Sequence, residues 1–251
     1  MSLDRPASRP PDREPDYSII VPVFNEAGAA PALAREIAEA FAGLAVEIVF
    51  VDDASTDGTK DGLARLAADI PALTVLAHRR NAGQSRAIRT GVLAARAPII
   101  VTLDGDGQND PADAPRLAAL LSSGPADLGL VGGMRALRRD SASKRWASRI
   151  ANAVRRRLLS DGASDSGCGL KAFRREAYLR LPFFDHNHRY LPALMRREGF
   201  AVAFEPVNHR QRLSGRSKYT NWGRLGAAVS DLAGVMWLRS RTRDPRGVDR
   251  I

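Results

Sequence analysis

The sequence predicts a protein of the α/β class, in which a mixed, mostly parallel central sheet is flanked by helices. Short apolar runs rich in β-branched residues alternate with stretches of helical periodicity through the first half of the chain. Strands joined in this way run parallel with right-handed crossovers, which places helices on both faces of the sheet. The chain has 251 residues, 44% of them hydrophobic, which is enough for a sizeable core.

The elements of the first half can be located from these patterns. The expected strands lie at residues 17–24, 46–51, 73–77, 98–103 and 128–132. The expected helices lie at residues 30–42, from a cap at Ser55 or Thr56 to about 70, at 84–95 and near 111–122. Each strand except the last is therefore followed by a helix.

Charge and cysteine content limit the partners and the compartment. The formal net charge is +10, which implies attraction to nucleic acid, a phosphorylated substrate or anionic lipid. Cys168 is the single cysteine, so no internal disulfide is possible and a reducing compartment fits. Residues 1–16 are rich in Pro, Arg and Asp without an apolar core, and we expect a disordered leader there. No stretch has the roughly 18 apolar residues of a spanning helix.

An acidic motif follows the strand expected at 98–103. Asp104 and Asp106 are two residues apart, so in extended geometry their side chains point the same way and can converge on one point. Gly105 and Gly107 let a ligand approach the backbone, and Gln108 adds an amide oxygen. These oxygens suit Mg²⁺ or Mn²⁺. The alternative is an Asp/Gly-rich turn with solvated carboxylates.

Other strands also end in polar side chains. Asn25 and Glu26 follow the first strand, Asp52 and Asp53 the second, and Arg135 the fifth. Ligands of open α/β sheets gather at the carboxyl ends of the strands, so this layout predicts a nucleotide site. No G-x-G-x-x-G follows the first strand and no G-x-x-x-x-G-K-[ST] occurs, which disfavours a dinucleotide fingerprint and a P-loop.

Several separated motifs together resemble a known family. Four of them are Ile20-Val-Pro-Val-Phe-Asn-Glu26, Val51-Asp-Asp-Ala-Ser-Thr-Asp-Gly-Thr59, Asn81-Ala-Gly83 and Asp104-Gly-Asp-Gly-Gln108. This set resembles the family 2 glycosyltransferases of GT-A fold. Three further motifs look like the polyprenyl-phosphate branch, whose best-known members are dolichol-phosphate mannose synthases. They are Asp165-Ser-Gly-Cys-Gly-Leu-Lys-Ala-Phe-Arg-Arg175, His188-Arg-Tyr-Leu-Pro192 and Arg212-Leu-Ser-Gly-Arg-Ser-Lys-Tyr219.

The resemblance, which covers roughly residues 17–240, implies an inverting glycosyltransferase. It implies transfer from GDP-mannose or a UDP-hexose to dolichyl or undecaprenyl phosphate, with Mg²⁺ or Mn²⁺ as cofactor. The residues implied for nucleotide-sugar binding are Pro22, Phe24, Glu26, Asp52, Asp53, Asp104, Gly105, Asp106, Arg135, Arg212 and Lys218. For Asp52 and Asp53 a helix-capping turn is the alternative.

The resemblance also divides these residues by role. Those implied as catalytic are Asp104, Asp106, Arg135, Arg212 and Lys218, and those implied as metal ligands are Asp104, Asp106 and Gln108. The loop that carries Arg212 and Lys218 would close over the phosphates, the alternative being an ordinary basic surface loop. Candidates for the acceptor side are Arg138, Arg139, Asp165, Lys171 and Arg174, with Asp165 as the base if the acceptor is a hydroxyl.

The chain should divide into three parts and attach to a membrane surface. The leader at 1–16 precedes a GT-A domain at 17–220 and a C-terminal amphipathic helix and tail at 221–251. Residues 144–159 form a second expected basic helix, for which core packing is the alternative. We expect peripheral attachment to an anionic membrane at its cytoplasmic face.

Three other functions compete with this one. The first is a family 2 transferase that acts on a sugar hydroxyl or another soluble acceptor. The second is a nucleic-acid binder, which we do not expect because no helix-turn-helix, zinc-finger or aromatic RNA-binding signature occurs. The third is an inactive binding protein, which the nearly complete set of polar site residues disfavours.

Overall fold

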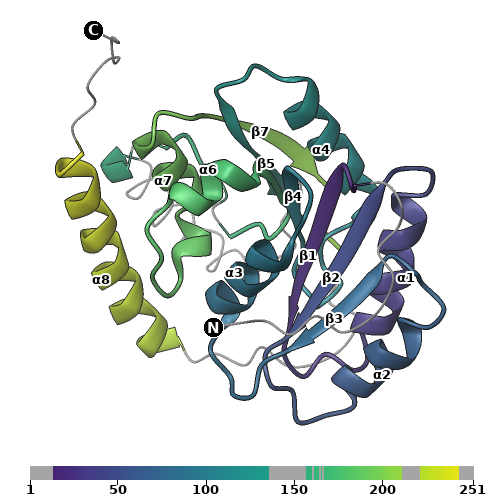
Figure 1. The fold of residues 1–251 in the computed structure, drawn as a ribbon. Coiled ribbons are helices and arrows are strands. Elements are labelled where there is room, and N and C mark those ends of the chain that lie inside the picture. The colour runs from purple at the N-terminus through teal and green to yellow at the C-terminus, as the bar shows by residue number, and fades with distance from the viewer. Residues whose placement is uncertain are drawn as a thin grey trace, which may run out of the picture.

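A seven-stranded sheet forms the centre of the molecule, with strand order β3-β2-β1-β4-β6-β5-β7 (Figure 1). The structure is a computed structural model that describes residues 14–135, 157–159, 161–163, 165, 167–210 and 221–242. The strands are β1 (Tyr17–Val23), β2 (Val46–Asp52), β3 (Leu73–Ala77), β4 (Ile99–Thr102), β5 (Leu128–Arg135), β6 (Lys171–Arg174) and β7 (Ala201–Val207).

The sheet is mixed and mostly parallel, as the sequence predicts. β1 pairs in parallel with β2 and β4, and β2 pairs in parallel with β3. β6 is antiparallel to both of its neighbours, β4 and β5, whereas β7 is parallel to β5. Six of these seven strands therefore run in one direction, and the end at which they finish is called here the carboxyl end of the sheet.

Helices cover both faces of this sheet. They are α1 (Ala30–Ala40), α2 (Thr59–Leu66), α3 (Gln84–Ala94), α4 (Ala114–Ser123), α6 (Arg175–Arg180), α7 (Leu191–Arg197) and α8 (Asn221–Ser240), with short 3-10 turns η1 (Pro111–Asp113) and η2 (Asn187–Arg189). Side chains of β1 alternate between two buried clusters: Ile19 and Val21 pack with α1, α2 and α4, whereas Ile20 packs with α3, α6 and α7. Because successive side chains of the strand point to opposite faces, the sheet has a hydrophobic layer on each face.

The sequence did not predict strands β6 and β7. β6 has four residues, begins with a lysine and ends with an arginine, so it lacks the apolar run of a buried strand. β7 carries Glu205 and Pro206 and lies at the margin of the sheet, where a proline costs no ladder hydrogen bond.

α8 runs along one side of the molecule beside α7 (Figure 1). No helix among the described residues combines the length and apolar character needed to cross a membrane. Of the predicted helix at 144–159, only residues 157–159 are described, and they are helical. Residues 1–13 of the leader and the basic loop at 211–220 lie outside the described residues, and the division into three parts remains a prediction.

Candidate functional site

Polar side chains gather at the carboxyl end of the sheet because the strands that precede them run in parallel. Glu26 follows β1, Asp52 ends β2, Asp104 follows β4 and Arg135 ends β5. β6 runs the opposite way and starts at this end, so Lys171 pairs with Thr102 of β4. The sheet topology therefore brings together residues that lie more than a hundred positions apart.

Hydrogen bonds connect the loop after β1 to the loop after β2. The Asn25 amide donates to Ser55 Oγ at 2.8 Å, and the Thr56 amide donates to Asn25 Oδ1 at 2.7 Å. The Glu26 amide donates to Thr59 Oγ1 at 2.8 Å. The predicted cap at Ser55 or Thr56 was wrong, because α2 begins at Thr59 and these two side chains serve the neighbouring loop instead.

Asp52 has one carboxylate oxygen that the chain leaves open. Its side chain is buried, with 1% of the residue exposed. Oδ2 accepts from the Ser55 amide at 3.2 Å, whereas Oδ1 has no hydrogen-bond partner among the described residues. A buried oxygen without a donor is costly, so the site is suited to a ligand that supplies an N–H or O–H group. The helix-capping alternative does not hold, since neither Asp52 nor Asp53 bonds an amide of α2.

Asp53 is occupied by the chain itself. Oδ1 accepts from the Ala82 amide at 2.9 Å, and Oδ2 accepts from the Gly83 amide at 2.8 Å. Oδ1 also lies 2.7 Å from His78 Nδ1, whose other ring nitrogen is 2.9 Å from Thr90 Oγ1. Asp53 therefore fixes the loop that enters α3, and its contact with the nucleotide stays a prediction.

Asp104 is held on two sides. Its Oδ1 accepts from Gln84 Nε2 at 2.8 Å, and its backbone amide donates to Asn109 Oδ1 at 2.9 Å. A Cβ on Gly169 would lie 2.3–2.4 Å from the carboxylate atoms, so a larger residue would displace the carboxylate. Burial, followed by the charge of Asp106, raises the pKa of Asp104 above its usual value, against the lowering effect of Lys171.

The loop after β4 offers the donor set of a hard cation. Asp104 and Asp106 lie close enough for the charge of one to raise the pKa of the other, a repulsion that a divalent ion would relieve. Gln108 is on the same loop, where its backbone amide donates a hydrogen bond to Asp106 Oδ1 at 3.1 Å. Among the described residues no three His, Cys, Asp or Glu side chains cluster, so such an ion would need oxygens from Gln108 or from a bound ligand.

Gly105 has a packing role that the sequence did not predict. A Cβ there would lie 2.5 Å from Val23 Cγ1 and 2.7 Å from the Pro22 carbonyl oxygen. The glycine therefore lets the loop pack against the end of β1, and approach of a ligand to its backbone stays a prediction. Gly107 has a φ of 74°, in the left-handed region that favours glycine.

Arg135 and Asp165 form a two-pronged ion pair. Arg135 Nε donates to Asp165 Oδ2 at 2.5 Å, and Nη2 donates to Oδ1 at 2.7 Å. Burial lowers the pKa of Arg135, but the hydrogen bonds and charge of Asp165 outweigh that effect and raise it, so the guanidinium stays charged. Because both oxygens of Asp165 bind Arg135, the arrangement does not suit a general base.

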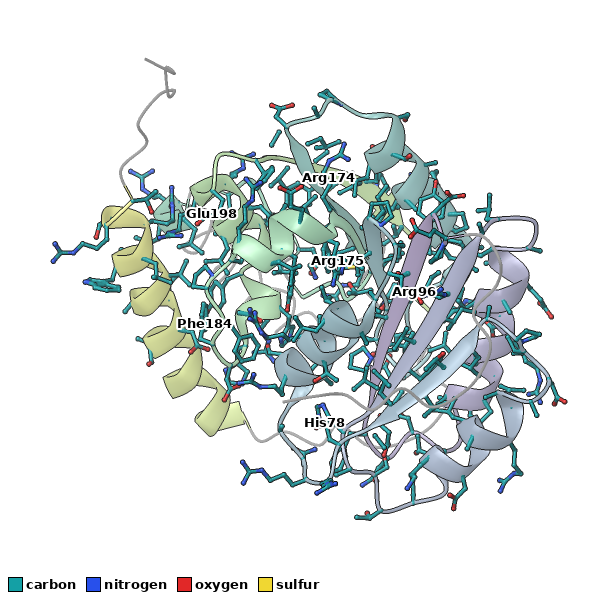
Figure 2. All side chains as sticks on the ribbon, in the orientation of Figure 1. His78, Arg96, Arg174, Arg175, Phe184 and Glu198 are labelled. Atoms are coloured by element: carbon teal, nitrogen blue, oxygen red, sulfur yellow. The ribbon has the colours of Figure 1, made fainter. Side chains whose placement is uncertain are left out.

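The remaining acceptor candidates separate into three groups. Lys171 is buried, its Nζ donates to the Cys168 carbonyl, and burial lowers its pKa. Arg174 was predicted wrongly: its guanidinium donates to the carbonyls of Leu128, Leu121 and Pro125, at the opposite end of the sheet. Figure 2 shows Arg174 far from His78, which lies at the carboxyl end. The acceptor candidates Arg138 and Arg139 lie outside the described residues, as do the predicted nucleotide-sugar-binding residues Arg212 and Lys218.

Three residues that the sequence did not single out organise the site. Gln84 and Gly169 contact the Asp104 carboxylate, and Arg210 fixes the loop beside it. The Arg210 amide donates to the Gln108 carbonyl at 2.9 Å, and its side chain lies 2.6 Å from Asp110 Oδ1. The available signals were the position of Gln84 directly after the Asn81-Ala-Gly83 motif and that of Gly169 within the motif at 165–175.

The sequence matches a protein family described as "Glycosyl transferase family 2" over residues 18–181. Similar curated proteins are the undecaprenyl-phosphate 4-deoxy-4-formamido-L-arabinose transferases of Pseudomonas aeruginosa (strain LESB58) and Pseudomonas syringae pv. syringae (strain B728a). The first is 36% identical over 208 residues and the second 36% over 207. Each alignment covers 81% of this chain, and the chain spans 60% of the length of each relative.

Solved structures share the fold. Glucosyl-3-phosphoglycerate synthase from Mycobacterium tuberculosis, in complex with Mn²⁺, UDP and glucosyl-3-phosphoglycerate, superposes with a TM-score of 0.67 at 19% identity, covering 97% of this chain and 88% of that one. A mannosyltransferase from Pyrobaculum calidifontis, in complex with GDP-Man and Mn²⁺, gives 0.61 at 24% identity, covering 85% and 62%. These matches agree with the predicted mixed sheet and its flanking helices.

Proposed function

The chain belongs to glycosyl transferase family 2, and from this premise we propose that it transfers a sugar from a nucleotide sugar to a polyprenyl phosphate. The observation that carries the proposal is the pair of acidic groups at the carboxyl end of the sheet. Asp52 offers a buried oxygen without a donor, and Asp104 lies with Asp106 on one loop. The relatives named as undecaprenyl-phosphate transferases support a lipid phosphate as acceptor.

The donor would bind across the ends of β1, β2 and β4. Asp52 accepts a hydrogen bond from the base or ribose, beside Pro22, Phe24 and Glu26 of the neighbouring strand end. Asp104, Asp106 and Gln108 would hold Mg²⁺ or Mn²⁺, which supplies Lewis-acid neutralisation of charge on the diphosphate. The structural neighbours that contain Mn²⁺ with UDP or GDP-Man support this cofactor class.

The reaction is a displacement at the anomeric carbon with inversion. An oxygen of the lipid phosphate forms the new bond, and the bond to the diphosphate oxygen breaks, so the electron pair leaves with the nucleoside diphosphate. A phosphate monoester has a second pKa of about 6, so the nucleophile is largely ionised without a strong base. Positioning and positive charge then matter most, and Arg135, which Asp165 keeps charged, supplies part of that charge.

The basic loop would add the rest of the charge. Arg212 and Lys218 are proposed to face the phosphates of the donor. The chain enters this loop from Arg210, whose amide is bonded to Gln108 beside the acidic loop. The alternative activity, transfer to a hydroxyl of a soluble acceptor, needs a base, and the ion pair of Asp165 with Arg135 leaves that residue poorly suited to the role.

We place the protein at the inner face of a membrane, attached peripherally through α8. Val229, Met236 and Trp237 of this helix are exposed by 61%, 39% and 59%. Basic residues accompany them, with the guanidinium of Arg241 5.9 Å from the Trp237 ring. An amphipathic helix with apolar and basic residues on its outer surface suits an anionic bilayer, where the lipid acceptor resides.

A transfer assay tests the proposed reaction. The protein is incubated with Mn²⁺ and either GDP-mannose, UDP-glucose or a UDP-N-acetylhexosamine, together with undecaprenyl phosphate or a soluble sugar acceptor. We expect a sugar-linked lipid phosphate with one donor, and loss of product with EDTA or in Asp106→Asn. Product only on the soluble acceptor would replace the lipid by the alternative acceptor, and no product with any donor would contradict transferase activity.

Vesicle binding tests the attachment separately. We expect sedimentation with phosphatidylglycerol vesicles at low salt, a blue shift of tryptophan emission, and loss of both in a Val229→Ser/Trp237→Ser double variant. Leu44→Ser is the matched control, because Leu44 is 45% exposed and lies after α1, on the other side of the sheet. Equal binding by both variants would remove α8 as the contact surface.

A further inference from the structure

We infer that Gln84 is a positioning residue for Asp104, which together with Gly169 it holds in the orientation that a bound divalent cation requires. The inference rests on the proposed function, since it concerns how the metal-binding carboxylate is aimed. It assigns a role to the first residue of α3, which has no part in the proposed chemistry.

Gln84 meets the carboxylate from one side. Its Nε2 donates to Asp104 Oδ1 at 2.8 Å, and this is the hydrogen bond that the carboxylate accepts among the described residues. Both side chains are partly buried. The bond engages Oδ1 and so restricts rotation of the carboxylate.

Gly169 closes the other side. A Cβ there would lie 2.3 Å from Asp104 Cγ and Oδ2 and 2.4 Å from Oδ1, which means that the glycine backbone lies directly against the carboxylate. The Gly169 carbonyl is itself fixed, because it accepts from Thr102 Oγ1 at 2.8 Å at the end of β4. The carboxylate is therefore confined between a backbone wall and an amide donor.

Gln84 is held in place by the residues around it. The two amides before it, of Ala82 and Gly83, donate to Asp53, and Gly83 has a φ of 86° that only glycine adopts readily. The residue after it, Ser85, has its Oγ 2.6 Å from His188 Nδ1 of η2. The Gln84 backbone is thus fixed on both sides. Through the hydrogen bonds of Asp53 to Ala82 and Gly83, the residue that holds Asp104 is also connected to the end of β2, where Asp52 lies.

Groups of this kind affect metal affinity more than protein stability. Removing a hydrogen-bond partner of a metal ligand typically lowers metal affinity about 10–100-fold, because the ligand must then be oriented during binding. Gln84→Met keeps the length of the side chain and lacks the N–H donor. Gln84→Asn keeps the amide and is one methylene too short to reach Asp104.

The experiment is calorimetric titration of UDP and GDP into the protein over a series of Mn²⁺ concentrations, which gives an apparent Mn²⁺ affinity without turnover. We expect both Gln84 variants to lower that affinity about 10–100-fold, with metal-free nucleotide affinity and melting temperature close to wild type. Ser85→Ala is the control, since it disturbs the start of α3 without touching Asp104, and we expect an effect within about twofold.

The outcomes separate this inference from the proposed function. If wild-type binding depends on Mn²⁺ and both Gln84 variants retain that dependence within about twofold, the positioning role is overturned and the proposed function stands. An equal loss in Ser85→Ala would also overturn it, because the effect would then come from α3 as a whole. If the wild-type affinity for both nucleotides is the same with and without Mn²⁺, the proposed metal site is contradicted.

Discussion

The two acidic pairs at the carboxyl end of the sheet look alike in sequence and behave differently in the structure. In the pair after β2, Asp52 leaves an oxygen open, whereas Asp53 gives both of its oxygens to the chain. In the pair after β4, Asp104 and Asp106 lie close enough for the charge of one to shift the pKa of the other. In the first pair one carboxylate has an open oxygen and the other anchors a loop, whereas in the second pair the two charges interact.

Spacing and backbone conformation together explain the difference. Neighbouring side chains of an extended chain point to opposite sides, so Asp52 turns toward the site and Asp53 toward the loop at 81–83. Residues 105 and 106 form a turn, so the extended geometry assumed for Asp104 and Asp106 does not hold, although the charge of Asp106 still acts on Asp104. The lesson is that the spacing of an acidic motif has to be read together with the backbone that carries it.

The largest expected effect is on turnover, at the β4 pair. Asp106→Asn removes one of the two carboxylates proposed to hold the metal, and loss of several kcal/mol of charge stabilisation lowers the transfer rate about a thousandfold or more. The measurement is product formation at saturating donor and Mn²⁺. Asp69→Asn, at an exposed carboxylate after α2, should match wild type. A loss below about tenfold in Asp106→Asn would break the assignment of this pair to the metal.

The next effect is on folding, at the anchor of the β2 pair. Asp53→Ala leaves the amides of Ala82 and Gly83 without their acceptor, and we expect the free energy of unfolding to fall by about 2–4 kcal/mol. Urea unfolding followed by circular dichroism measures it. Unchanged stability would show that the loop into α3 is held by other contacts, and the division within the pair would lose its basis.

Asp52→Asn should show the opposite pattern. It removes the negative charge from an oxygen that the chain leaves open, so stability should change by less than about 1 kcal/mol. Nucleotide affinity should fall about tenfold or more, because a charge-assisted hydrogen bond is lost. Calorimetry with UDP and GDP measures the affinity. A variant that unfolds like Asp53→Ala while binding nucleotide normally would reverse the roles of the two residues.

The smallest expected effect concerns pH and the support of α3. Burial lowers the pKa of His188 well below 6.5, so below pH about 6.5 the unfolded chain binds a proton that the folded chain does not. This group therefore makes stability fall as the pH drops, by at most about 1.4 kcal/mol per pH unit. Unfolding in urea at pH 7.5, 6.5 and 5.5 measures the slope.

His188→Asn should flatten that slope. The raised pKa of Asp104 works in the opposite direction, since the folded state then holds the extra proton and gains stability as the pH falls. The difference between wild type and His188→Asn isolates the histidine. A slope identical in both would mean that His188 titrates alike in the folded and unfolded chains.

The sequence predicted the first half of the fold and the polar residues at its strand ends, because buried parallel strands carry a strong local pattern. Strand 73–77 has the predicted bounds. Asp104 and Asp106 interact electrostatically, but the chain between them is a turn and not the extended segment that was expected. It did not predict β6 and β7, whose residues lack that pattern.

Residue roles that depend on distant contacts could not be read locally. Nothing near Gly169 in the sequence shows that it lies against Asp104, and nothing near Arg174 shows that it binds carbonyls at the far end of the sheet. Asp53 could have been separated from Asp52 by the alternation of side chains along an extended strand. Its partners at 82 and 83 were visible only in the structure.

The most direct test of the central claim is calorimetric binding of UDP and GDP, with and without Mn²⁺, to wild type, Asp52→Asn and Asp106→Asn. If the two pairs have separate roles in one nucleotide-sugar site, Asp52→Asn weakens binding with and without the ion. Asp106→Asn then removes only the increment that Mn²⁺ adds. Equal losses under both conditions in the two variants, or wild-type binding that ignores Mn²⁺, would contradict the account.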